Sequence, residues 1–134
     1  MRAFGPPPSL PEIEALARDA LLRLPEPFAA TVRDVVLIVA DFAEEDVLAE
    51  MGIEDPYELT GLYVGHPLTE RSHDHSGRLP DQVFLYRAPI LLEWSEAEDS
   101  LEALVAHVLI HEIGHHFGLS DDDIDALETA AGDE

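Results

Sequence analysis

The hydrophobic positions divide the chain into helical and extended segments. Ser9-Leu10-Pro11-Glu12 matches a capping box with proline near the first helical position. Apolar residues then recur at helical spacing to about Leu24, and Pro25 and Pro27 follow. This pattern predicts a helix from Ser9 to about Leu24. Two further helices are predicted from Ser100 to about Phe117, where the chain is strongly apolar, and from Ser120 to about Ala130.

Shorter apolar runs predict three strands, at Val35–Val39, Leu59–Gly65 and Gln82–Arg87. A short acidic helix is expected over residues 43–51, and Pro89 is expected to close the last strand. The resulting order of elements, α–β–(α)–β–β–α–α, is typical of the α+β class. We expect a single domain over residues 9–134, preceded by a proline-rich, disordered lead-in over residues 1–8.

The composition supports one folded domain and excludes several kinds of site. With 134 residues, of which 46% are hydrophobic, the chain is long and apolar enough for one core. Cysteine is absent, which excludes disulfide scaffolds, thiolate zinc sites and cysteine nucleophiles. No apolar run approaches the ~18 residues of a membrane span. The first eight residues lack the apolar region of a secretory signal, so we expect a cytoplasmic protein.

The charge is strongly negative. Twenty-nine acidic residues face seven basic ones, all arginine, for a formal net charge of −22. Such a surface repels nucleic acids and anionic membranes, and it attracts cations and basic peptides. The alternative interpretation is a well-solvated acidic surface that serves solubility.

A metal-binding motif lies inside the long C-terminal helix. His111-Glu112-Ile113-Gly114-His115 has the form His-Glu-x-x-His. On a helix the two histidines are ~40° apart around the axis and ~6 Å apart along it, so both imidazoles can bind one metal ion. Glu112 points to the side of this pair, where it can hydrogen-bond a water molecule at the metal. Two neutral imidazoles suit zinc and leave room for a third ligand.

The residues after the motif supply a candidate third ligand. Gly118 and Asp121 extend it to His-Glu-x-x-His-x-x-Gly-x-x-Asp. In a continuous helix Asp121 would lie ~9 Å further along the axis and ~120° off the ligand face. Glycine commonly ends helices, so a turn at Gly118 can bring Asp121 back to the metal. The alternatives are Asp122, Asp123, Glu128 or no protein ligand. Gly118 can also be an ordinary C-cap, with Ser120 capping the next helix.

The same motif, with Leu119-Ser120-Asp121, resembles a family of small bacterial zincin-like metallopeptidases. The resemblance covers about Leu24 to Leu127 and includes Leu24–Phe28, Gly61–Tyr63, Pro67–Ser72 and Phe84–Arg87. It implies a minimal zincin fold, in which a small mixed sheet packs on an N-terminal helix and a C-terminal active-site helix. It also implies one zinc ion at His111, His115 and Asp121.

Other side chains are weaker candidates. Four have a cationic or phenolic donor that could contact the substrate or the transition state: Tyr63, Arg71, Tyr86 and Arg87. Each also has a structural interpretation in sheet packing or ion pairing. We expect His107 to be packed in the core, with support of the metal site as the alternative. His116 is expected to face elsewhere, and Trp94 to pack in the core or at its edge. The remaining histidines are expected on solvated loops: His66, His73 and His75.

These observations together predict a zinc-dependent metallopeptidase that hydrolyses peptide bonds with Glu112 as general base. Its substrate is expected to be a neutral or basic peptide or protein, and neither nucleic acid nor membrane is an expected partner. The first alternative is a catalytically silent zinc-binding interaction module, against which the intact Glu112 argues. The second is a metal-free acidic partner protein in which the motif is a coincidence.

Overall fold

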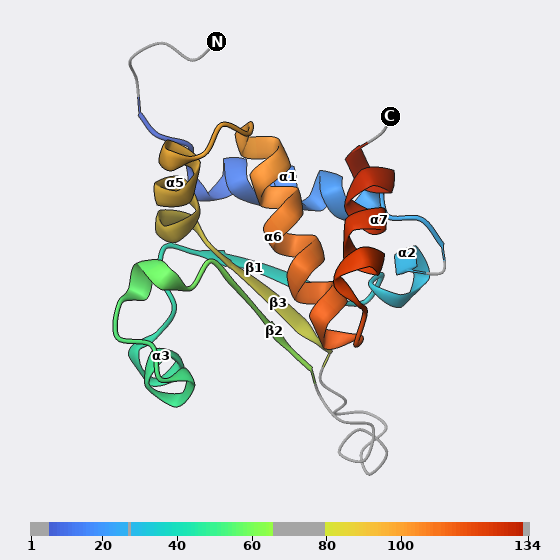
Figure 1. Cartoon of the computed structure of the whole chain (residues 1–134). Coiled ribbons are helices and arrows are strands. Elements are labelled where there is room, and N and C mark those ends of the chain that lie inside the picture. The colour runs from blue at the N-terminus through green and yellow to red at the C-terminus, as the bar shows by residue number, and fades with distance from the viewer. Residues whose placement is uncertain (1–5, 27, 66–79, 133–134) are drawn as a thin grey trace.

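A computed structural model describes residues 6–26, 28–65 and 80–132 (Figure 1). Within these residues, three strands form one sheet in the order β1-β3-β2. The central strand β3 (Gln82–Tyr86) pairs in parallel with β1 (Val36–Ala40) and antiparallel with β2 (Gly61–Val64). This mixed sheet, together with the helices around it, confirms the predicted α+β class.

The predicted long helices are present. They are α1 (Leu10–Leu22), α6 (Leu101–His116) and α7 (Asp121–Gly132), and the predicted short acidic helix is α3 (Glu45–Met51). The capping box at the start of α1 forms as its sequence predicts. The Ser9 side chain accepts a hydrogen bond from the Glu12 amide, and the Glu12 carboxylate accepts one from the Ser9 amide at 2.8 Å.

The side chains of β3 alternate between two clusters. Val83 and Leu85 belong to the main core, which the strands share with α1, α6 and α7. Phe84 and Tyr86 pack in a smaller cluster with residues of α3 and the segment after it, among them Leu48. Figure 1 shows α6 running across the sheet with α7 alongside it. The helix that carries the metal-binding motif is therefore fixed by the main core.

The last strand is followed directly by a helix that the sequence pattern did not predict. α5 (Arg87–Glu96) begins where β3 ends, and Tyr86 is its N-cap. The expectation that Pro89 closes the last strand is wrong. Pro89 lies buried in the first turn of this helix. Proline is tolerated there because amides of the first turn have no acceptor within the helix. Trp94, on α5, packs against the main core as predicted.

Two short elements were also not predicted. They are α2 (Phe28–Thr31) and the 3-10 helix η1 (Pro56–Glu58). Among the described residues, none of the helices combines the length and apolar character that crossing a bilayer requires.

The first described residues are hydrogen-bonded to the segment that follows β3. Pro8, within the predicted lead-in, is buried, and its carbonyl accepts a hydrogen bond from Arg87 Nε at 2.6 Å. Arg87 also pairs with Asp41 at 3.1 Å. The first five residues of the lead-in lie outside the described residues.

Candidate metal centre

Three histidines lie on successive turns of α6. The rings of His107 and His111 are 4.2 Å apart between centroids, and those of His111 and His115 are 5.5 Å apart. The four-residue spacing places them along one side of the helix. The His-Glu-x-x-His motif thus lies on a regular helix, as its chemistry requires.

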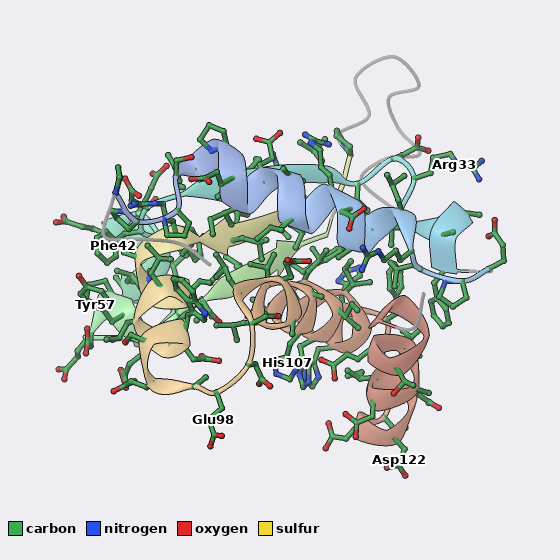
Figure 2. The ribbon with its side chains drawn as sticks, turned by 90° about the horizontal axis from the view of Figure 1, so that it is seen from above. Arg33, Phe42, Tyr57, Glu98, His107 and Asp122 are labelled. Atoms are coloured by element: carbon green, nitrogen blue, oxygen red, sulfur yellow. The ribbon has the colours of Figure 1, made fainter. Side chains whose placement is uncertain are left out.

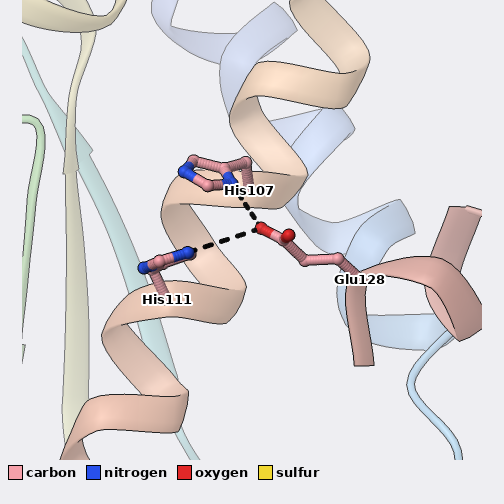
Figure 3. A group of neighbouring side chains, drawn as sticks. All are labelled: His107, His111 and Glu128. Carbon is pink, nitrogen blue, oxygen red and sulfur yellow. Dashed lines mark ion pairs between the residues drawn. The ribbon is translucent and has the colours of Figure 1, made fainter. Parts of the chain in front are cut away.

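A carboxylate from α7 reaches the first two of these rings. Oε1 of Glu128 contacts Nδ1 of His107 and lies 3.8 Å from Nε2 of His111 (Figure 3). Each of the three residues offers a ligand atom within 4.8 Å of the others. The Glu128 Oε1 atom is buried, and its contacts in the described residues are with these ring nitrogens. This group, called below the His107 cluster, therefore has the donor types and spacing for a cation.

The connection between α6 and α7 forms as the sequence predicts. Gly118 has a φ of 73°, its amide donates to the His115 carbonyl, and the Leu119 amide donates to the Gly114 carbonyl. This pair of hydrogen bonds is a Schellman motif, which ends α6. Ser120 then caps α7 by accepting a hydrogen bond from the Asp123 amide at 3.1 Å. The two helices consequently run antiparallel.

The two helices are in tight contact at Gly114, inside the motif. A Cβ built on Gly114 would lie 2.6 Å from Cγ1 and 2.9 Å from Cδ1 of Ile124, which is fully buried on α7. No side chain fits at this position without displacement. The glycine in His-Glu-Ile-Gly-His therefore allows α7 to lie against the histidine-bearing helix.

We expect Gly114→Ala to lower the free energy of unfolding by about 1–3 kcal/mol, because the added methyl group overpacks a filled contact. Urea unfolding of the metal-free protein measures the loss. In an Ile124→Ala background the same substitution should cost less, because the clashing atoms are gone. An equal cost in both backgrounds would show that the contact with Ile124 is not the cause.

Asp121, the predicted third ligand, is the first residue of α7 and is exposed. It lies at the His115 end of the helix pair, whereas Glu128 lies at the His107 end. Glu128 follows Asp121 by seven positions, so the two acids share one face of α7, ~10 Å apart along its axis. The His107 cluster includes neither His115 nor Asp121. The ligand set His111, His115 and Asp121 therefore stays a prediction.

Glu112 is half-buried against the edge strand β2. Its Cγ atom would lie 3.1 Å from a Cβ on Gly61, so the glycine lets α6 approach the strand. The Tyr63 backbone amide donates a hydrogen bond to the Glu112 carboxylate. Burial raises the pKa of Glu112, while His115 and the Tyr63 hydrogen bond lower it in part. The predicted general base thus has a higher proton affinity than an exposed glutamate.

The side chain of Tyr63, on β2, contacts neighbouring side chains. The Tyr63 hydroxyl donates to Asp81 at 3.0 Å, and its ring stacks on His116 at 4.0 Å between centroids. His116 thus faces the sheet edge rather than the side of His111, as expected. A Cβ on Gly65 would overlap the His116 ring, so that glycine makes room for it.

The remaining predicted donors differ in their surroundings. Tyr86 is buried, and its pKa is raised by burial and by the charges of Glu44 and Glu112. Arg87 is engaged by Asp41 and the Pro8 carbonyl, which matches its structural interpretation. The other candidates lie outside the described residues: His66, Arg71, His73 and His75.

The prediction for His107 was wrong. Its side chain is 49% exposed and lies on the side of α6 away from α1, as Figure 2 shows. The apolar residues around it in sequence, such as Val108 and Leu109, lie on other sides of the helix and are buried there. The four-residue spacing to His111, which places both rings on one side of α6, favours the alternative prediction of a position beside the metal site.

Comparison with known proteins supports the same family. Comparison with curated proteins gives no match. A family model described as zincin-like metallopeptidase matches residues 32–131, most of the chain. The matched region contains the sheet, the motif on α6 and the whole of the α6–α7 connection. The chain therefore belongs to the zincin-like metallopeptidases.

Proposed function

We propose that the protein is a zinc-dependent peptidase in which Glu112 is the general base. The observation that supports this most directly is the environment of Glu112. Its carboxylate lies between the sheet edge and the histidine-bearing side of α6, with a pKa raised by burial. A site that held a metal only for structure would need no such base. Family membership supports the same reaction class.

The donor set fits zinc. His111 and His115 are the residues proposed to hold the ion, with Asp121 as the third ligand. All are nitrogen or carboxylate donors, and one position would remain open at a catalytic zinc ion. When bound, zinc acidifies a water molecule and polarises the carbonyl of the scissile bond.

The protein's own residues supply the proton transfers. Glu112 accepts a proton from the attacking water and later donates it to the leaving amine. Its raised pKa makes it a stronger base than an exposed carboxylate. The Tyr63 amide holds the carboxylate beside β2, so the base does not have to be ordered during the reaction. Tyr63, Tyr86 and Arg71 remain proposed contacts to the substrate or the transition state.

Chelation should abolish hydrolysis. We expect the purified chain with zinc to cleave members of a mixed peptide library, and a strong chelator to stop cleavage. Added zinc should then restore the activity. Mass spectrometry of the products measures all three states. Cleavage that continues without metal would contradict the proposal. Zinc binding without any cleavage would favour the silent interaction module.

The proposed substrates are neutral or basic near the scissile bond. The net charge of −22 and the exposed acids Asp121, Asp122 and Asp123 beside the proposed site favour such peptides. Screening acts over ~8 Å at physiological ionic strength, so the preference should weaken as salt rises. The cleavage profile of the library at low and high salt checks this. A preference for acidic residues, or one that salt leaves unchanged, would contradict it.

A further inference from the structure

We infer that His107, His111 and Glu128 form a cation-binding position of their own, one helical turn before the His111–His115 pair. The two positions share His111. The contacts of Glu128 are the first support for this inference. Its side chain extends from α7 to two histidine rings on α6 (Figure 3). The shorter ring spacing, 4.2 Å against 5.5 Å, belongs to this upstream pair.

The state of the Glu128 carboxylate also points to a cation. Its Oε1 atom is buried, the side chain is only 23% exposed, and the contacts found for this oxygen in the described residues are with ring nitrogens of His107 and His111. When these ring nitrogens carry no proton, their lone pairs face the buried carboxylate oxygen, and this arrangement is unfavourable unless a cation lies between them. A divalent ion between this oxygen and the two imidazoles satisfies the oxygen and uses the preferred donors of zinc.

A cavity lies beside this position. It has a volume of about 510 Å³, and His107 and Glu128 form part of its wall. Several acidic side chains also line it: Asp19, Glu93, Asp99 and Glu102. Asp19 pairs with Arg23, which lines the same cavity. Carboxylates around a concave surface raise the local concentration of cations, so the cavity favours divalent ions beside the cluster.

The upstream position lacks a base. Glu112 is held at β2 by the Tyr63 amide, whereas Glu128 approaches His111 from α7. An ion held by His107, His111 and Glu128 therefore links α6 to α7 without activating water next to Glu112. We take Nε2 of His111 as the ligand atom at both positions, and this atom can bind only one ion at a time. The upstream position thus competes with the proposed catalytic one and holds the metal in an inactive arrangement. This competition, unlike the upstream position itself, rests on the proposed function.

Zinc titration against a competing chelator tests the upstream position. His115→Ala removes a ligand of the downstream pair only, and this variant should still bind one zinc ion per chain. Adding Glu128→Gln should then weaken binding at least ~10-fold, the lower end of what changes around a metal site cost. Asp125→Asn in the same background is the control, because it removes an equal charge from an exposed position on α7 that is not a candidate ligand. Loss of zinc binding in His115→Ala alone, or an equal effect of the control, would overturn the inference.

Two further measurements test the competition. The wild-type chain should bind one zinc ion at saturation, and His111→Ala should bind none. Two ions per wild-type chain would overturn the competition. Glu128→Gln should raise kcat at saturating zinc, because metal no longer occupies the inactive position, and a lower kcat would overturn it. The thermal unfolding of each metal-free variant verifies that it folds. Failure of the proposed function would appear separately, as zinc-loaded protein without hydrolysis.

Discussion

Glu112→Gln is expected to abolish peptide hydrolysis and to leave zinc binding nearly unchanged. Glutamine has almost the same size and can still accept the hydrogen bond of the Tyr63 amide, but it cannot take a proton from water. A general base contributes ~10²–10⁴-fold to the rate, so kcat should fall by that factor. Steady-state kinetics on a cleaved library peptide, together with zinc titration, measures both quantities.

The matched control for this variant is Glu50→Gln, an exposed glutamate on α3 far from the motif in sequence. It makes the same chemical change and should leave kcat unaltered. A Glu112→Gln protein with wild-type kcat would rule out Glu112 as the base. A variant that also loses zinc would show that the substitution disturbs the ligands rather than the proton transfer.

Stability against pH provides an independent check of the same variant. The pKa of Glu112 is raised above its ordinary value of 4.5 in the folded metal-free protein. The protonated carboxyl group therefore adds to the free energy of unfolding. This contribution is fully present below the pKa that Glu112 has in the unfolded chain, and it is lost as pH rises through its pKa in the folded protein. Glutamine does not ionise, so its contribution to the free energy of unfolding does not change over this pH range. Glu112→Gln should consequently match the wild type near pH 4 and exceed its free energy of unfolding at pH 7–8.

Asp121→Asn is expected to lower zinc affinity more than any neighbouring substitution. Asparagine keeps the size of the side chain but removes the anionic ligand, and we expect a loss of at least ~10-fold. Asp122→Asn and Asp123→Asn should cost only capping and helix-dipole energy, about 0.3–1 kcal/mol each. The titration is best made in a Glu128→Gln background, so that the His107 cluster does not conceal the loss.

A companion variant tests the turn without touching a ligand. Gly118 has a φ of +73°, and a Cβ there would meet nothing within 4 Å. Gly118→Val is therefore strained only in its backbone, and the strain should displace the start of α7 and weaken zinc binding. If Asp122→Asn or Asp123→Asn loses as much affinity as Asp121→Asn, the register of the third ligand is wrong. If none of the three loses affinity, the ligand comes from elsewhere.

The features that the sequence predicted correctly are local ones. Ser9 and Ser120 cap helices because a serine side chain reaches the amide three residues ahead, and Glu12 reaches back to the Ser9 amide, whatever the tertiary structure. Gly118 likewise ends α6 through its own backbone freedom. The helix that carries the motif, the helix after it and the turn between them could therefore be predicted from the sequence.

The features that were missed depend on neighbours distant in sequence. Pro89 follows a strand pattern, and only the packing of α5 shows that it begins a helix instead. The residue patterns of β1 and β3 do not indicate that the two strands pair in parallel. His107 lies among apolar residues, yet which side of α6 is covered depends on where α1 and the sheet pack. The approach of Glu128 to His107 and His111 likewise required the antiparallel course of α7.

The division of the site between a helical hairpin and a strand has a consequence for how the protein loses activity. All residues proposed to hold metal lie between His107 and Glu128, in one contiguous segment, whereas Glu112 is oriented by Tyr63 of an edge strand. Contacts close in sequence have a small entropy of closure and reform readily, while an edge strand is held from one side by its sheet. As denaturant is added, the orientation of the base should therefore fail first. Hydrolysis should end at a lower urea concentration than zinc release, leaving an inactive, metal-loaded form between the two transitions.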